Sequence, residues 1–120
     1  MANAKLRVAV ISAGRMASTI DDEIIEQPYW PTLRSHLPYS HAATYSQVPD
    51  VHIVAVSDLE EGKCKTFCER WRVPRYYLDY REMIVQEIPD LVSIATPGST
   101  HAEMTVFAAE HGVRGIYCEK

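Results

Sequence analysis

Short, nearly continuous apolar runs alternate along this chain with segments in which apolar residues return every three or four positions. The runs are rich in β-branched residues, which is typical of parallel strands buried on both faces of a sheet. They predict five strands, the third being the weakest: Leu6–Ile11, Val51–Ser57, Arg75–Tyr77, Leu91–Ala95 and Gly115–Cys118.

Between these runs, apolar side chains recur at helical spacing. Glu60–Trp71 carries one apolar stripe, which predicts a helix packed on the sheet. A shorter helix is expected after Asp79, whose side chain can cap it. A third helix is expected after Thr100, with Glu103 at the spacing of a capping box and Gly112 as the residue that closes it.

The alternation of strands and helices predicts right-handed βαβ units and a parallel sheet covered by helices on both faces. We expect an α/β fold with a doubly wound sheet of the Rossmann type, in the strand order 3-2-1-4-5. The chain has 120 residues, of which 47% are hydrophobic, so residues 1–120 are expected to form one domain rather than two.

One stretch, residues 21–40, breaks the alternation. It holds three prolines with aromatic residues between them, and neither helical nor strand periodicity continues past Ile25. We expect an ordered inserted loop, because aromatic residues at that density would not stay solvated.

The turn after the first predicted strand carries a form of the dinucleotide-binding motif G-x-G-x-x-G/A, with Ser12, Gly14 and Ala17 at its three small positions. The first position makes a tight turn, the second lets the backbone approach a pyrophosphate, and the third lets helix and strand pack closely. Ser12 departs from the glycine of the motif. Backbone N–H groups at the start of the following helix, around Arg15 and Met16, would meet the pyrophosphate.

Asp58 directly follows the second predicted strand, where an acidic residue accepts hydrogen bonds from the adenosine ribose. Its distance from Gly14 is 58 − 14 = 44 positions, against roughly 20 in the motif, and the inserted stretch explains most of the excess. A carboxylate here, backed by Glu60 and Glu61, would repel a 2′-phosphate, which favours NAD over NADP. Asp58 could also cap the helix that follows, and the two roles are compatible.

Four blocks, in this order and spacing, resemble the Gfo/Idh/MocA family (glucose–fructose oxidoreductase / inositol dehydrogenase). They are Val8–Ala17, Val54–Asp58, Ser93–His101 and the C-E-K of residues 118–120. The resemblance implies the NAD-binding domain of an oxidoreductase. It also implies hydride transfer between nicotinamide and a sugar, an inositol or a related polyol.

The same resemblance implies further cofactor-binding residues. Thr96 and Pro97 would lie beside the nicotinamide-side ribose, and His101 near the middle of the cofactor. Gly98 stands where family members usually have Asn, so a side-chain contact is not expected there.

Glu119 and Lys120 match the E-K of the family's E-K-P motif. The resemblance implies that Glu119 contributes to cofactor binding and that Lys120 lies at the reacting carbon, where alcohol oxidation needs a proton acceptor. The alternative for Lys120 is a solvated terminal side chain. Family members continue into a second, substrate-binding domain that is absent here, so the chain alone is expected to bind cofactor and to be catalytically incomplete.

Two other functions fit the same fold. One is a regulatory or structural module that binds a nucleotide without chemistry. The other is a domain that binds S-adenosylmethionine, which would also use an acidic ribose partner but does not explain Thr96-Pro97 or Glu119-Lys120.

Composition narrows the partners. The net charge is −4 and the basic residues are scattered, so nucleic acid is not expected. The first apolar run has only the length of a strand, so we expect neither a signal peptide nor a membrane span, and a cytoplasmic location. The bare edge of the fifth strand predicts a homo-oligomer.

Three cysteines without a secretion signal argue against a disulfide framework. Cys64 and Cys68 lie on one helix face and are expected to be buried structural residues rather than metal ligands.

Smaller signals remain. His41 matches a histidine that the family often places near the end of its first helix, and a packing or helix-capping role is expected. A metal site at residues 21–23, which are all acidic, is conceivable, but a solvated helix end is expected. The Tyr29-Trp30 pair could fold over the adenine or substrate, and cover for the sheet edge is the plainer expectation.

Overall fold

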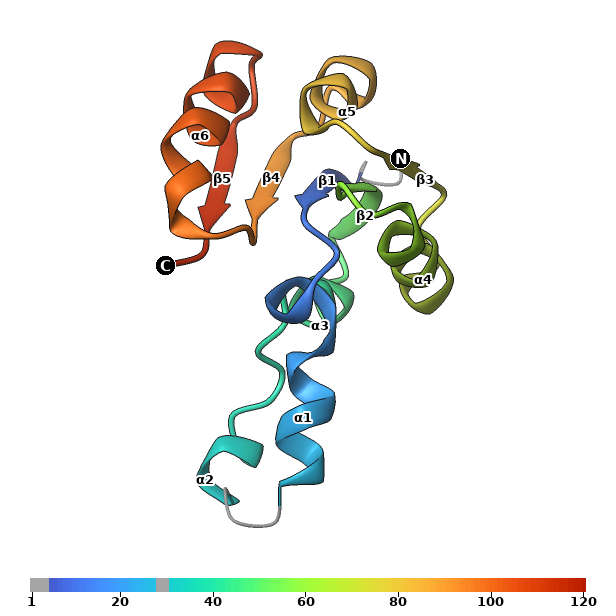
Figure 1. Ribbon diagram of the computed structural model, residues 1–120, viewed down its shortest axis with the longest axis vertical. Helices are drawn as coiled ribbons and strands as arrows, with labels where there is room; N and C mark the ends of the chain where they lie inside the picture. Colours follow the sequence, from blue (N-terminus) through green and yellow to red (C-terminus); the bar gives the residue numbers. More distant parts are fainter. Residues whose placement is uncertain (1–4, 28–30) are drawn as a thin grey trace.

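Five parallel strands form one sheet in the order β3-β2-β1-β4-β5, which confirms the predicted fold class and strand order. The computed structural model describes residues 5–27 and 31–120 (Figure 1). The strands are β1 (Leu6–Ile11), β2 (Val51–Ser57), β3 (Arg75–Tyr77), β4 (Leu91–Ile94) and β5 (Gly115–Cys118). Only β4 differs from its predicted bounds, ending at Ile94 instead of Ala95.

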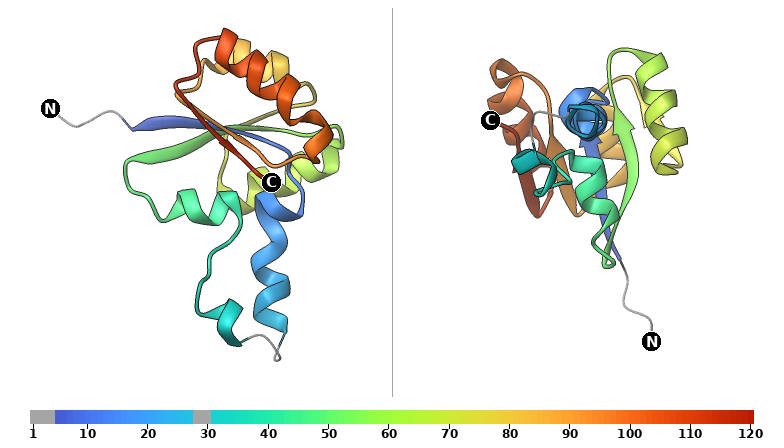
Figure 2. Two further views of the ribbon diagram at one scale, coloured as in Figure 1. Left: turned by 90° about the vertical axis from the view of Figure 1, so that its left-hand side faces the viewer. Right: turned by 90° about the horizontal axis from the view of Figure 1, so that it is seen from below.

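Helices cover both faces of the sheet (Figure 2). One face carries α5 (Tyr80–Glu87) and α6 (His101–Glu110), and the other carries η1 (Arg15–Thr19), α3 (His41–Ser46) and α4 (Glu61–Trp71). This is the doubly wound arrangement that the alternation of elements predicted.

The core is divided by the central strand β1 into two clusters. On one side Val8 packs in a cluster with Phe67 of α4, and on the other Ala9 packs in a cluster with Met83 of α5. All four side chains are at most 1% exposed. Successive residues of a strand point to opposite faces, so a strand covered on both sides needs apolar residues at every position, which explains its continuous apolar run.

The inserted stretch contains more helix than expected. The element α1 (Ile20–Glu26) continues η1 outward, and a one-turn helix α2 (Pro31–Arg34) follows. The prediction of a loop without helix beyond Ile25 was therefore wrong at α2. A helix of four residues is too short to show a periodic apolar pattern. The Tyr29-Trp30 pair lies outside the described residues.

The outward segment forms a hairpin that projects away from the sheet on the side of α3 (Figures 1 and 2). Its base is closed by Asp21 in α1, whose carboxylate accepts hydrogen bonds from the backbone N–H groups of Tyr39 (2.6 Å) and Ser40 (3.2 Å). The hairpin thus leaves and rejoins the fold at neighbouring points.

Two of the three predicted helix signals are confirmed. Asp79 is the N-cap of α5, and its side chain accepts a hydrogen bond from the backbone N–H of Arg81 at 2.9 Å. Gly112 follows His111, the C-cap of α6, and has a φ of +80°, a conformation that favours glycine.

The predicted capping box at Thr100 and Glu103 is wrong. The Thr100 hydroxyl turns back to the Thr96 hydroxyl (2.7 Å) and makes no cap bond to α6, while the Glu103 carboxylate pairs with Arg81 of α5. Both side chains found partners outside their own helix, which local spacing does not reveal.

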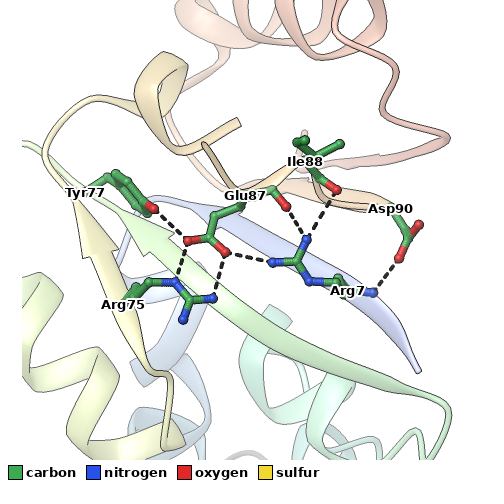
Figure 3. Close-up of polar contacts among 6 residues, drawn as sticks. All are labelled: Arg7, Arg75, Tyr77, Glu87, Ile88 and Asp90. Atoms are coloured by element: carbon green, nitrogen blue, oxygen red, sulfur yellow. Dashed lines mark hydrogen bonds and ion pairs between the residues drawn. The ribbon is translucent and has the colours of Figure 1, made fainter. Parts of the chain in front are cut away.

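A buried carboxylate joins α5 to two strands of the sheet (Figure 3). Glu87 is 5% exposed and accepts hydrogen bonds from Arg75 (2.6 and 2.8 Å), from the Tyr77 hydroxyl (2.6 Å) and from Arg7 (2.8 Å). The hydrogen bonds from Arg75 hold the pKa of Glu87 below its ordinary value. This network, which fastens α5 to β1 and β3, was not predicted from the sequence.

The cysteine prediction holds for one of the two helix residues. Cys64 is fully buried and Cys68 is half-buried. Burial raises the pKa of the Cys64 thiol to about 11, as expected for an unreactive core thiol.

Within the described residues, no helix is both long and apolar enough to cross a membrane.

Candidate functional site

The residues predicted to bind the cofactor all follow the carboxyl ends of strands. Ser12 and Gly14 follow β1, Asp58 follows β2, Thr96 follows β4, and Glu119 follows β5. In a parallel sheet these ends share one edge, which is where open α/β sheets bind their ligands.

The turn after β1 keeps the geometry of the dinucleotide motif although its first residue is serine. Ser12 has a φ of +96°, in the region that favours glycine, and its Oγ accepts a hydrogen bond from the Gly14 N–H at 3.2 Å. Holding a non-glycine residue there costs about 1 kcal/mol. Arg15 and Met16 begin η1, and the first N–H groups of a helix have no partner within it.

Asp58 joins this turn to the end of β2. Its Oδ2 accepts a hydrogen bond from the Ala13 N–H and its Oδ1 accepts one from the Glu60 N–H, both at 2.9 Å. The N-cap of α4 is Glu60, so Asp58 fixes the turn before that helix rather than capping it. The contacts place a carboxylate directly beside the small-residue turn.

A cavity of about 420 Å³ lies between η1 and the start of α4, with Gly14, Arg15 and Lys63 in its lining. Both cationic side chains are already paired: Arg15 with Glu23 at 2.8 Å and Lys63 with Glu60 at 2.6 Å. A phosphate in this cavity would have to compete with those carboxylates.

The loop after β4 is tied together around Thr96. His101 Nε2 lies 2.6 Å from the Thr96 carbonyl oxygen, and the Thr96 hydroxyl lies 3.4 Å from the Met104 sulfur. Pro97 is exposed and precedes the 3-10 turn η2 (Gly98–Thr100). The structure therefore brings Thr96 and His101 together.

Glu119 contacts a residue 78 positions earlier in the chain. Its Oε2 lies 2.9 Å from Nε2 of His41, whose side chain is 1% exposed, and the His41 ring meets the Tyr117 ring edge-on at 4.7 Å. The N-cap of α3 is Ser40, so a capping role for His41 is wrong and a buried, packed role is correct. Lys120 follows and is exposed.

The predicted solvated helix end is correct for Asp22 and Glu23, whose side chains are 49% and 48% exposed, and wrong for Asp21. Asp21 is 7% exposed, Asp22 makes a two-point pair with Arg70 at 2.6 and 2.9 Å, and Glu23 pairs with Arg15. Among residues 5–27 and 31–120, no three His, Cys, Asp or Glu side chains are grouped to hold a metal ion.

Neither the structural role of Asp21 nor the partner of His41 was predicted from the sequence. A signal for Asp21 was present, because Ala17, Asp21 and Ile24 lie at i, i+4 and i+7 and so share the buried face of η1 and α1. No local signal marked the His41–Glu119 pair, whose members are 78 positions apart.

A parallel sheet in this order, with a small-residue turn after β1 and a carboxylate after β2, defines a Rossmann-type nucleotide-binding fold. Residues 33–120 match the family model GFO_IDH_MocA, described as an oxidoreductase family with an NAD-binding Rossmann fold. The chain belongs to this Gfo/Idh/MocA family.

Curated relatives include two dehydrogenases. The chain is 28% identical to D-glucoside 3-dehydrogenase of Escherichia coli (strain K12), over all of the chain and 28% of that protein. It is 33% identical to scyllo-inositol 2-dehydrogenase (NAD(+)) of Bacillus subtilis (strain 168), over 70% of the chain and 25% of that protein. The chain thus spans about a quarter of the length of these relatives.

Solved structures show the same fold. One is scyllo-inositol dehydrogenase from Lactobacillus casei with bound NAD(H) and scyllo-inositol, which has a TM-score of 0.71 at 14% identity. The match covers 97% of the present chain and 28% of the dehydrogenase chain. A probable dehydrogenase from Thermotoga maritima has a TM-score of 0.69 at 25% identity, covering 96% of the chain and 28% of its own.

Proposed function

We propose that this chain is the NAD-binding part of a dehydrogenase that moves hydride between nicotinamide and a secondary alcohol carbon of a sugar, inositol or related polyol. The observation that carries the proposal is the carboxylate of Asp58, fixed 2.9 Å from the Ala13 N–H at the edge where β1 and β2 end. The glucoside and inositol dehydrogenases among the relatives support the substrate class.

The turn after β1 suits a pyrophosphate. The N–H groups at the start of η1, those of Arg15 and Met16, would bind the phosphate oxygens, because a helix N-terminus carries partial positive charge. Asp58 would accept hydrogen bonds from the adenosine ribose hydroxyls, and its charge would disfavour a 2′-phosphate at that place. This preference selects NAD over NADP.

The far side of the edge would hold the nicotinamide half. Thr96 and Pro97 would lie beside the nicotinamide-side ribose. His101 would keep the loop of Thr96 in place through its 2.6 Å contact with the Thr96 carbonyl oxygen. Glu119 would bind the nicotinamide half of the cofactor from the end of β5. These residues would hold the nicotinamide half, and the cofactor, when bound, would supply the hydride acceptor. Lys120 would hold the proton released by the substrate hydroxyl at its Nζ.

Recognition of the substrate is assigned to residues outside this sequence, because the chain spans only about a quarter of its relatives. We expect residues 1–120 by themselves to bind the cofactor and to catalyse little or no turnover.

Calorimetric titration with NAD⁺, NADH, NADPH and S-adenosylmethionine tests the proposal. We expect NADH to bind more tightly than NADPH, and Asp58→Asn, which keeps an acceptor but loses the charge, to weaken NADH about tenfold and to narrow that preference. Asp79→Asn, a cap residue of α5, serves as the control and should bind like the unchanged protein. Tighter binding of NADPH or S-adenosylmethionine would contradict the assignment.

A further inference from the structure

The pair of His41 and Glu119 links two parts of the molecule that the sheet does not join. His41 is the first residue of α3, on the face opposite α5 and α6, and Glu119 follows the edge strand β5. The Glu119 N–H still donates to the Ile94 carbonyl at 2.8 Å, which extends the pairing of β5 with β4. The backbone of Glu119 is therefore held by the sheet, while its carboxylate is held by His41.

The position of His41 is itself fixed from three directions. The preceding Ser40 is fully buried, and its Oγ caps α3 by accepting a hydrogen bond from the Ala43 N–H at 3.1 Å. The Ser40 N–H donates to Asp21 of the hairpin. The edge of the Tyr117 ring then sets the tilt of the imidazole.

Packing alone does not explain a histidine at this place. Its Nδ1 is buried without a partner in the described part of the chain, and an unpaired buried polar atom costs free energy that an apolar side chain would avoid. The carboxylate accepts, so the hydrogen of the contact is on Nε2, and this hydrogen bond is what an apolar replacement would lose.

Glu119 lies at the boundary between core and solvent. Its side chain is 19% exposed, against 1% for His41. One carboxylate oxygen, Oε2, is occupied by the imidazole, which restricts the direction in which the other can point. A carboxylate held in this way keeps one fixed acceptor at the carboxyl edge of the sheet.

On the basis of the proposed function, we propose that His41 is a positioning residue. Its Nε2–H holds the Glu119 carboxylate in the orientation that binds the nicotinamide half of the cofactor. The same contact limits the freedom of the adjoining Lys120. Asp21 supports the arrangement by fixing where α3 begins, so the inserted hairpin and the cofactor edge are linked through the consecutive residues Ser40 and His41.

Titration of the protein with NADH tests this role, with affinity and thermal unfolding measured on the same samples. His41→Leu fills the space but removes the donor and should weaken NADH about tenfold. Glu119→Gln should weaken it to a similar degree, and the double variant should lose little more, because both changes remove one interaction. His41→Gln keeps a donor and should recover much of the affinity. His52→Leu, an exposed histidine of β2, is the matched control.

The outcomes separate the two proposals. If the unchanged protein does not bind NADH, the proposed function fails and this inference fails with it. If it binds and His41→Leu lowers only the unfolding temperature, His41 merely packs and the inference alone is overturned. If the losses of NADH affinity in the two single variants add up in the double variant, the inference is also overturned, because the two side chains then act independently. Where His41→Leu does not fold, an affinity for His41→Gln no higher than that for Glu119→Gln would overturn the role.

Discussion

Asp58 Oδ2 lies 2.9 Å from the backbone nitrogen of Ala13, 45 positions earlier in the chain. One side chain at the end of β2 therefore sets the shape of the turn at the end of β1. The contact makes this residue structural before any ligand binds.

Replacing this side chain should destabilise the unliganded protein. Asp58→Ala leaves the N–H groups of Ala13 and Glu60 without their acceptor and should lower the free energy of unfolding by about 1–2 kcal/mol. Asp58→Asn keeps only one of the two acceptor oxygens and should lose about half as much. Urea unfolding measures both, and equal losses in the two variants would show that charge, not the acceptor, matters here.

The C-cap of α5, Ile88, has an unfavourable backbone conformation. Ile88 has a φ of +47° and is 72% exposed, and a β-branched side chain is strained in that conformation. Ile88→Gly should raise the free energy of unfolding by about 1 kcal/mol. Arg72→Gly is the matched control, because Arg72, the C-cap of α4, has a φ of +56° without a β-branch and its replacement should gain less stability. A loss of stability in Ile88→Gly would refute the strain argument.

The network around Glu87 should make stability depend on pH. Hydrogen bonds from Arg75 lower the pKa of Glu87, so its contribution is complete above the ordinary carboxyl pKa, about 4.3, and is lost as the pH falls through the lowered value. Glu87→Gln should cost about 2 kcal/mol at pH 7, less than for a fully buried pair because Arg75 is half-exposed.

That cost should shrink in acid, because protonation of Glu87 in the unchanged protein removes the same charge. Urea unfolding between pH 7 and pH 3 measures it. Glu82→Gln, exposed on the same helix, should show no comparable trend. If the loss of unfolding free energy in Glu87→Gln stays constant down to pH 3, the carboxylate charge of Glu87 does not stabilise the protein.

The base of the hairpin should depend on Asp21. Asp21→Ala leaves the N–H groups of Tyr39 and Ser40 unpaired and should cost about 2 kcal/mol, with faster hydrogen exchange at those two amides. Asp22→Ala removes a surface pair with Arg70 and should cost under about 1 kcal/mol. Equal effects of the two changes would show that Asp21 is no more than a surface residue.

The strands and their order were predictable because burial on both faces leaves an unambiguous pattern. Val8 and Ala9 point to opposite sides of the sheet and both need apolar neighbours, so the run carries the signal without knowledge of its partners. The helix α2 left no such pattern. The Thr100 cap failed because a competing partner, the Thr96 hydroxyl, becomes a neighbour only after folding.

The candidate site was predictable where one element carries the whole signal. The turn at Ser12 and Gly14 and the carboxylate of Asp58 each follow directly from a strand end. The contact of His41 with Glu119 and the Glu87 network join residues from distant elements, and their pairing depends on tertiary geometry that no spacing records.

The hairpin of α1 and α2 begins and ends at neighbouring points, because Asp21 holds the returning backbone at Tyr39 and Ser40. A segment with such close ends can change in length without moving the sheet, since the loop-closure entropy grows only slowly with length. Its outer part is therefore expected to tolerate insertions. An affinity tag or fluorescent reporter inserted there would leave the five strands in register. Evolution could vary the same place without redesigning the core.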